Sequence, residues 1–137
     1  MPDTGSTIGA KGVKVLIIED DAFLQKILVT KFTKEGFDVV NTGDGAEAIP
    51  MMKAESPAFV LLDLILPNMN GFEVLAEMMT DDVLKKIPVF VLSNLGQEED
   101  MTRAKDMGAI DFLVKTDMSI NEVVQKVKEA YVRYMHK

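Results

Sequence analysis

Short apolar runs alternate along this chain with segments of helical periodicity, and this alternation restricts the possible folds more than any other feature. Five runs rich in Val, Ile, Leu and Phe are predicted to be strands: 13–18, 37–40, 58–62, 89–92 and 110–114. Most of them are continuously apolar, which is typical of strands buried on both faces of a sheet. Right-handed crossovers between such strands give a parallel, doubly wound sheet. We therefore predict one α/β domain.

Helices are predicted in the stretches between these strands. They are expected over about 22–35, from Asp44-Gly45 onward, around 72–78, from 97 to Gly108, and over 119–134. Pro50 lies inside the second helix, so we expect that helix to start late, to kink or to be short. Asp21 is expected to cap the first helix. Ser119 and Glu122 have the spacing of a capping box and should open the last one.

Length and composition exclude several classes of protein. The chain has 137 residues and a mass of 15.2 kDa, which fits one domain. It has no cysteine, and its one histidine is His136, so disulfides, thiolate metal sites, Ser-His-Asp chemistry and multi-histidine metal sites are excluded. The net charge of −7 argues against direct binding to nucleic acid. No apolar run approaches the roughly 20 residues that span a bilayer, and the start lacks a secretion signal, so we expect a cytoplasmic protein.

Charged and hydroxyl side chains follow four of the predicted strands. Glu19 and Asp20 come after the first strand, Asp63 after the third, Ser93 after the fourth and Lys115 after the fifth. Ligands of open parallel sheets bind at the carboxyl ends of the strands, so these side chains should converge. Crowded carboxylates repel one another unless a cation neutralises them, and oxygen ligands of this kind suit magnesium. A free carboxylate beside such a metal can act as a nucleophile, as in aspartyl-phosphate chemistry.

Four segments, LIIEDD, VLLDLILPNMNGFEVL, PVFVLSN and DFLVK, together resemble the receiver domain of two-component response regulators. The resemblance runs over about residues 13–134. It implies a flavodoxin-like (β/α)5 fold with five helices and strand order 2-1-3-4-5, formed by a domain of residues 13–137. Residues 1–12 are polar, small and Gly-rich, so we expect them to form a flexible segment. It also implies a role for each matching residue: Asp63 as phosphoacceptor, Asp20 directly and Glu19 through water as magnesium (or manganese) ligands, the backbone carbonyl of Ile65 as a further ligand, Ser93 as phosphoryl contact and switch, Lys115 as the partner of Asp63, and Phe112 as the aromatic switch.

The same resemblance implies a signalling function. The phosphoryl group would come from a sensor histidine kinase or a histidine phosphotransfer protein. It would change the surface of the fourth helix, fifth strand and fifth helix, and thereby the affinity for a downstream protein partner. We expect no output domain in this chain, no turnover of an external substrate, no direct contact with nucleic acid or membrane, and a monomer or weak dimer.

Some residues depart from the usual receiver pattern and keep other functions open. Thr116 stands where receivers usually have proline, and Asn94 follows the hydroxyl residue where a small residue is common. These two changes are the only support for an alternative, a pseudo-receiver that binds proteins without phosphorylation. The full set of Glu19, Asp20, Asp63, Ser93 and Lys115 argues against that alternative. A phosphatase with an aspartyl nucleophile would need a second Asp where Ile65 stands. Because Ile65 and Leu95 are apolar and cannot orient a water molecule, we expect phosphate to leave Asp63 slowly.

Overall fold

The computed structural model describes residues 12–94 and 97–135, and these form a five-stranded parallel sheet. The sheet has the order β2-β1-β3-β4-β5, which confirms the predicted flavodoxin-like topology. Its strands are β1 (Lys14–Ile18), β2 (Asp38–Thr42), β3 (Phe59–Leu62), β4 (Val89–Ser93) and β5 (Asp111–Val114). Apart from Gly12, the predicted flexible segment of residues 1–12 lies outside the described residues.

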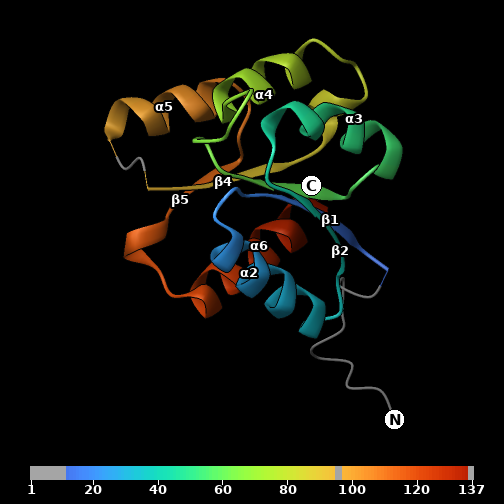
Figure 1. Cartoon of the computed structure of the whole chain (residues 1–137), viewed down its shortest axis with the longest axis vertical. Helices are drawn as coiled ribbons and strands as arrows, with labels where there is room; N and C mark the ends of the chain where they lie inside the picture. The colour runs from blue at the N-terminus through green and yellow to red at the C-terminus, as the bar shows by residue number, and fades with distance from the viewer. Residues whose placement is uncertain (1–11, 95–96, 136–137) are drawn as a thin grey trace.

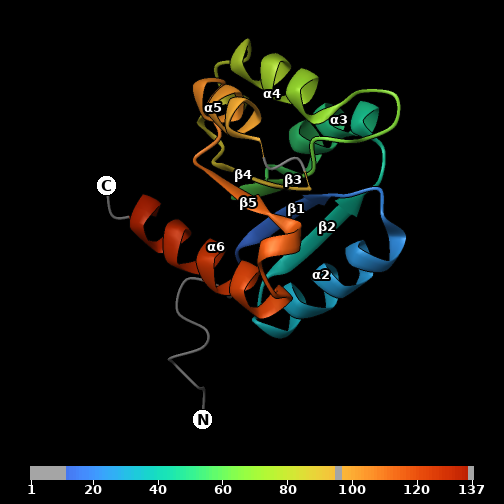
Figure 2. The ribbon, with the colours of Figure 1, turned by 90° about the vertical axis from the view of Figure 1, so that its left-hand side faces the viewer.

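Helices cover both faces of this sheet (Figures 1 and 2). The α-helices are α2 (Ala22–Lys34), α3 (Gly45–Glu55), α4 (Gly71–Met79), α5 (Glu98–Asp106) and α6 (Ile120–Met135). Helices α3, α4 and α5 lie on one face, and α2 and α6 lie on the other. Two short 3-10 segments, η1 (Leu84–Lys86) and η2 (Lys115–Asp117), were not predicted. Within the described part of the chain, no helix combines the length and apolarity needed to cross a membrane.

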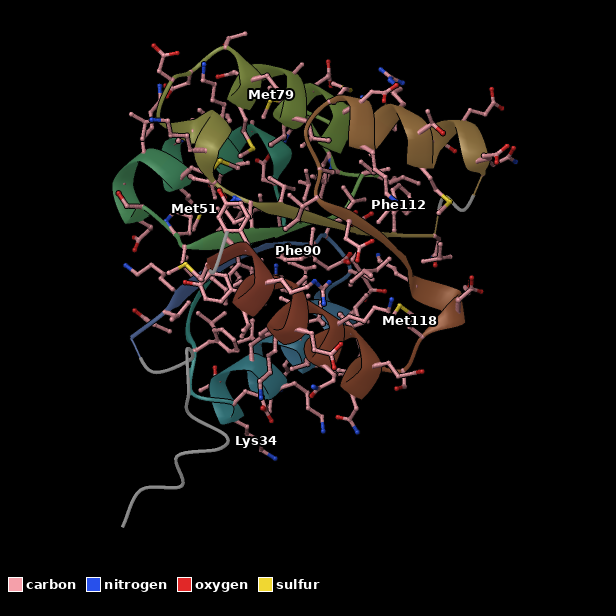
Figure 3. The ribbon with its side chains drawn as sticks, turned by 180° about the vertical axis from the view of Figure 1, so that it is seen from behind. Lys34, Met51, Met79, Phe90, Phe112 and Met118 are labelled. Carbon is pink, nitrogen blue, oxygen red and sulfur yellow. The ribbon has the colours of Figure 1, made fainter. Side chains whose placement is uncertain are left out.

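Two separate apolar cores explain why the strands are continuously apolar. Leu16, Ile18 and Leu62 point to the face under α3, α4 and α5, whereas Ile17, Phe59 and other side chains point to the face under α2 and α6. Because successive side chains of a strand point to opposite faces, every position of the central strands β1, β3 and β4 is buried except Lys14 at the start of β1. Figure 3 shows the same division for two aromatic residues, with Phe112 and Phe90 on opposite sides of the sheet.

The largest difference from the predicted boundaries concerns β2. The apolar run predicted a strand over 37–40, but pairing with β1 continues to Thr42, which lies beside Ile18. Since β2 is an edge strand, Asn41 can occupy it without being buried. Phe37 lies before the strand and packs edge-on against Phe32 and Phe59, with ring centroids 5.4 and 5.6 Å apart.

Helix α3 does not start late, although Pro50 lies inside it. It begins at Gly45, directly after its cap Asp44, whose carboxylate accepts a hydrogen bond from the backbone N–H of Ala46 at 2.8 Å. Proline removes the N–H that would bond to the carbonyl of Ala46. Pro50 and Ala46 are both exposed, so water can replace the lost donor. The helix therefore continues through Pro50 to Glu55.

The other predicted helix caps are confirmed. The Asp21 carboxylate accepts hydrogen bonds from the backbone N–H groups of Phe23 and Leu24 at 3.0 and 3.1 Å. Ser119 and Glu122 exchange the two hydrogen bonds of a capping box. These caps fix where α2 and α6 begin, and with them the loops that follow β1 and β5.

An aromatic cluster beneath the sheet should dominate its stability. Phe59 is fully buried and its ring contacts those of Phe32, Phe37, Phe90 and Tyr131. Phe59→Ala should therefore lower the free energy of unfolding by about 3–5 kcal/mol, because it leaves a cavity in a packed core. Urea unfolding followed by circular dichroism measures this loss.

The matched control is Phe23→Ala, since the Phe23 side chain is 76% exposed. This substitution should change the free energy of unfolding by no more than about 0.5 kcal/mol. Equal losses in the two variants would contradict the assigned core.

Candidate functional site

The carboxyl edge of the sheet gathers the side chains predicted from the strand ends. Glu19 and Asp20 follow β1, Asp63 follows β3 and Lys115 follows β5. Ile18 pairs with Leu62 across β1 and β3, so the residues after them leave the sheet side by side. Ser93 ends β4 beside Val114, next to Lys115. All five predicted residues therefore lie at one edge.

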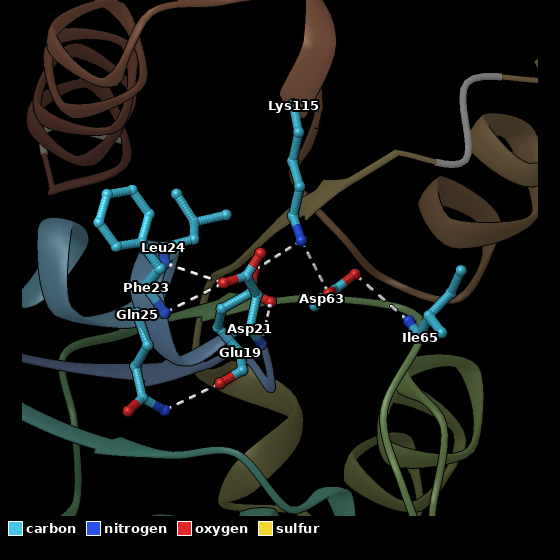
Figure 4. A network of polar contacts seen from close by, with 8 residues as sticks. All are labelled: Glu19, Asp21, Phe23, Leu24, Gln25, Asp63, Ile65 and Lys115. Carbon is cyan, nitrogen blue, oxygen red and sulfur yellow. Dashed lines mark hydrogen bonds and ion pairs between the residues drawn. The ribbon is translucent and has the colours of Figure 1, made fainter.

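The Lys115 ammonium connects two of the carboxylates (Figure 4). Its Nζ lies 2.7 Å from Oε1 of Glu19 and 2.9 Å from Oδ2 of Asp63. Both acids are almost completely buried, with 2% and 5% of their surface exposed. Because buried charges are costly unless they are paired, this shared ammonium joins the ends of β1, β3 and β5 electrostatically.

The loop after β1 is held by bonds to helix α2. The second Glu19 carboxylate oxygen accepts a hydrogen bond from the backbone N–H of Asp21 at 3.0 Å. The Gln25 side chain donates to the backbone carbonyl of Glu19 at 2.8 Å. Since Asp21 also caps α2, the helix start and the Glu19 carboxylate are fixed as one unit.

The loop after β3 presents Asp63 beside the start of α4. The backbone N–H of Asp63 donates to the carbonyl of Ile18 at 3.0 Å, and Oδ1 of Asp63 accepts from the N–H of Ile65 at 3.3 Å. Gly71 begins α4 against this loop. A Cβ at Gly71 would lie 2.5 Å from the carbonyl oxygen of Asp63, so only glycine fits without a shift.

Burial and charge crowding change the acidity of this cluster. Burial raises the pKa of Glu19 to about 7, and the nearby Asp63 charge adds to this effect, while Lys115 and the Asp21 N–H partly offset it. Burial alone would lower the pKa of Lys115, but its hydrogen bonds to Glu19 and Asp63 outweigh burial and raise it above its usual value. Lys115 therefore stays charged, and Glu19 titrates near neutrality.

Three carboxylates of this cluster fit a divalent cation. One oxygen each of Glu19, Asp20 and Asp63 lies within 4.8 Å of the others. This spacing is close to the span of roughly 4 Å between opposite ligands of octahedral magnesium. Three carboxylates face one ammonium, so the site has an excess of negative charge that a cation would neutralise. Asp20 is exposed, which leaves the site open to solvent ions.

Comparison with known proteins agrees with this geometry. The family model described as response regulator receiver domain matches residues 15–128. The chain belongs to this family. It is 32% identical over 123 residues to the probable transcriptional regulator ycf27 of Porphyridium aerugineum, covering 85% of this chain and 50% of that protein.

Solved receiver structures also match. A chain of the CheX–CheY–BeF3–Mg2+ complex from Borrelia burgdorferi has a TM-score of 0.80 and 33% identity, covering 88% of this chain and 90% of that one. The phosphorylated cyanobacterial phytochrome response regulator RcpA has a TM-score of 0.74 and 31% identity, covering 86% and 90%. The receiver domain described here spans about half of the length of the curated relatives that it matches, from 39% to 64%.

The remaining predicted residues of the receiver domain are also located by the structure. Ser93 is fully buried at the end of β4, and Phe112 is 6% exposed and belongs to the core under α3, α4 and α5. The Ile65 side chain is 55% exposed beside Asp63. The peptide bond between Lys115 and Thr116 is trans, as are the others in the described ranges. Leu95 and His136 lie outside those ranges.

Several residues that shape the site of the receiver domain were missed by the sequence analysis. Gln25 holds the Glu19 loop, and Gly71 allows α4 to approach Asp63. Asn70 and Glu73 form a capping box at the start of α4. The spacing Asn-x-x-Glu before an apolar helix could have revealed this cap. Gln25 carries no comparable signal, because its contact depends on the geometry of the loop.

The pKa of Glu19 predicts how magnesium binding at the acidic cluster of Glu19, Asp20 and Asp63 would depend on pH. Protons compete with the cation for Glu19, so affinity should fall as the pH falls through about 7. Between about pH 8 and about pH 6 the ionised fraction of such a group drops roughly tenfold, and the magnesium affinity should drop with it. Isothermal titration calorimetry with MgCl2 measures this change.

Glu19→Gln is the control for this prediction. The variant should bind magnesium more weakly than the parent at high pH, and its affinity should vary little over the same range. A parent protein with a flat affinity profile would contradict the role of Glu19.

Proposed function

We propose that this receiver domain accepts a phosphoryl group on the carboxylate of Asp63 from the phosphohistidine of a sensor kinase or a phosphotransfer protein. The observation that carries the proposal is the position of Asp63. One of its oxygens lies 2.9 Å from the Lys115 ammonium, and the residue also belongs to the cluster that fits a cation. A nearly buried carboxylate that lies beside an ammonium group and a cation site is suited to receive a negatively charged group.

The transfer is a nucleophilic displacement at phosphorus. A carboxylate oxygen of Asp63 forms the new O–P bond, the P–N bond to the donor imidazole breaks, and the imidazole leaves as the neutral base after taking up a proton. Lys115 stabilises the charge on the phosphoryl oxygens of the loose transition state. Mg2+ (or Mn2+), held by Glu19, Asp20, Asp63 and the backbone carbonyl of Ile65, would supply further positive charge to these oxygens.

Two relatives support this chemistry by their descriptions. The RcpA structure is of a phosphorylated response regulator, and the Borrelia complex contains BeF3 and Mg2+. Both are more than 30% identical to this chain and cover most of it. The same metal-assisted chemistry on Asp63 is therefore the function that the site supports best.

The proposed output is a change in partner affinity. The Ser93 hydroxyl would move toward the phosphoryl group, and the Phe112 side chain would reorient in response. The surface of α5, β5 and α6 would then change its affinity for a downstream protein. Ser93 pairs with Val114 in the register of β4 and β5, and Phe112 lies two residues earlier on β5. The two switch residues thus share one strand pair. We propose no turnover of an external substrate, and the cytoplasm remains the predicted location.

Phosphorylation of Asp63 has a direct test by intact mass spectrometry. Incubation with acetyl phosphate or phosphoramidate should add about 80 Da when magnesium is present and nothing when it is chelated. Asp63→Asn should abolish the gain because the amide cannot act as the nucleophile. Asp106→Asn, a change at an exposed position on α5, is the matched control and should retain it.

A parent protein that gains no mass with either donor would contradict the proposal. This outcome would favour the pseudo-receiver, a module that binds its partner without phosphorylation. A gain that persists in Asp63→Asn would instead show a different acceptor residue.

The apolar side chain of Ile65 predicts a long-lived phosphorylated state. Ile65 lies beside Asp63 and offers no polar group that could orient an attacking water molecule. Ile65→Asn should speed the loss of phosphate by about tenfold or more, because an amide can hold water near the phosphorus. Ile110→Asn, which changes an exposed isoleucine in the loop before β5, should leave the rate unchanged. Equal rates in the parent and Ile65→Asn would refute this role.

A further inference from the structure

We propose that residues 42–45, which run from the last residue of β2 to the first residue of α3, position the metal-binding acids relative to the phosphoacceptor loop. None of these residues was predicted as a site residue. The proposed role deepens the function proposed above and rests on it. These residues contact the turn that carries Glu19 and Asp20 on one side and the segment that follows Asp63 and Ile65 on the other, and we call them the bracing loop.

On one side, the bracing loop holds the turn that carries Glu19 and Asp20. The backbone N–H of Glu19 donates to the carbonyl of Thr42 at 3.0 Å. Gly43 lies against the same turn, since a Cβ at this position would stand 3.4 Å from both the Asp20 Cα and the Glu19 carbonyl oxygen. The backbone of the two acids is therefore in contact with the bracing loop.

On the other side, the bracing loop holds the segment between Asp63 and α4. The backbone N–H of Gly45 donates to the carbonyl of Pro67 at 3.2 Å. The Asn68 side chain donates to Oδ2 of Asp44 at 3.1 Å. A Cβ at Gly45 would stand only 1.6 Å from the carbonyl oxygen of Met69. This close approach requires glycine, because the obstacle is backbone and cannot rotate away.

The bracing loop is itself fixed by α3. The Thr42 hydroxyl donates to the Glu47 carboxylate and accepts from the backbone N–H of Asp44. The other Asp44 oxygen caps the helix through the N–H of Ala46. Thr42 is buried, so its two bonds are partly shielded from water, whereas the Asp44 cap bond is exposed.

Asp63 is already tied to β1 through its N–H bond to Ile18. A fixed loop that contacts the Glu19 turn and the segment after Ile65 adds a second tie, which limits how that segment moves relative to the turn. This limit matters for the cation, because its proposed ligands are Glu19 and Asp20 from the turn, and Asp63 with the carbonyl of Ile65 from just before that segment. Magnesium tolerates little deviation from octahedral geometry. A shift of the segment after Asp63 away from the Glu19 turn should therefore weaken magnesium binding, although every ligand remains present.

Gly45→Ala tests this role, because the added methyl group must displace Met69 and its neighbours. Magnesium binding is measured by calorimetry with MgCl2 and no phosphoryl donor. The dissociation constant should rise roughly tenfold or more, the usual cost of losing support behind a metal ligand.

Asn68→Gly is the second variant and covers the case in which Gly45→Ala does not fold. Asn68 has a φ of +68°, which glycine adopts freely, so only its side-chain bond is lost. The bond is exposed, so the rise should be smaller but in the same direction.

Gly108→Ala is the matched control for a loss of stability alone. Gly108 has a φ of +105° and lies between α5 and β5, so alanine strains the fold away from the bracing loop. This variant should unfold at a lower temperature with an unchanged magnesium dissociation constant. The role is refuted if Asn68→Gly binds magnesium as tightly as the parent. It is also refuted if Gly108→Ala weakens magnesium binding as much as Gly45→Ala and Asn68→Gly do.

The two proposals fail in different ways. If the parent protein gains no mass from acetyl phosphate, the proposed function is wrong. If the parent is phosphorylated but Gly45→Ala and Asn68→Gly bind magnesium as tightly as the parent, only the positioning role of the bracing loop is wrong.

Discussion

The sharing of one ammonium by two buried carboxylates is the interaction on which the site depends. Glu19 and Asp63 have almost no contact with water, and Lys115 is their common counter-charge. Neither acid could remain ionised there at low cost without it. The pairing also joins three strands that are far apart in the sequence, so it can form only when β1, β3 and β5 stand in their final order. Fold and chemical site are thus specified together.

The parallel sheet explains why much of this site could be predicted from the sequence. Every strand except β2 contains an uninterrupted apolar run, and the first polar residue after that run lies at or just beyond the carboxyl end. Glu19, Asp63 and Lys115 were found in this way, and the structure brings them within ion-pair distance. The parallel, doubly wound class followed from the residues, because right-handed crossovers and burial on both faces leave few alternatives. The strand order 2-1-3-4-5 was implied by the resemblance to receiver domains, and the structure confirms it.

Other parts could not be predicted, for physical reasons. The end of β2 was placed too early because Asn41 and Thr42 are polar, and an edge strand does not require apolar residues. The tight contact of Gly45 with Met69 joins two loops whose approach no periodicity encodes. The sequence also gives no sign that Glu19 is buried while its neighbour Asp20 is exposed. Such features depend on how the loops pack after the sheet has formed.

The polar outer strand has a consequence for how copies of this protein behave in concentrated solution. An unprotected edge strand offers unpaired backbone donors and acceptors to any extended chain, and such pairing commonly initiates aggregation. Asp38 and Asn41 project from β2 into water, and Asp111 occupies the start of β5 at the opposite margin. Adding a strand from a second molecule would bury or crowd these polar groups. Asn41, whose polarity hid the end of β2 from the sequence analysis, is thus one of the residues that discourage intermolecular β-pairing.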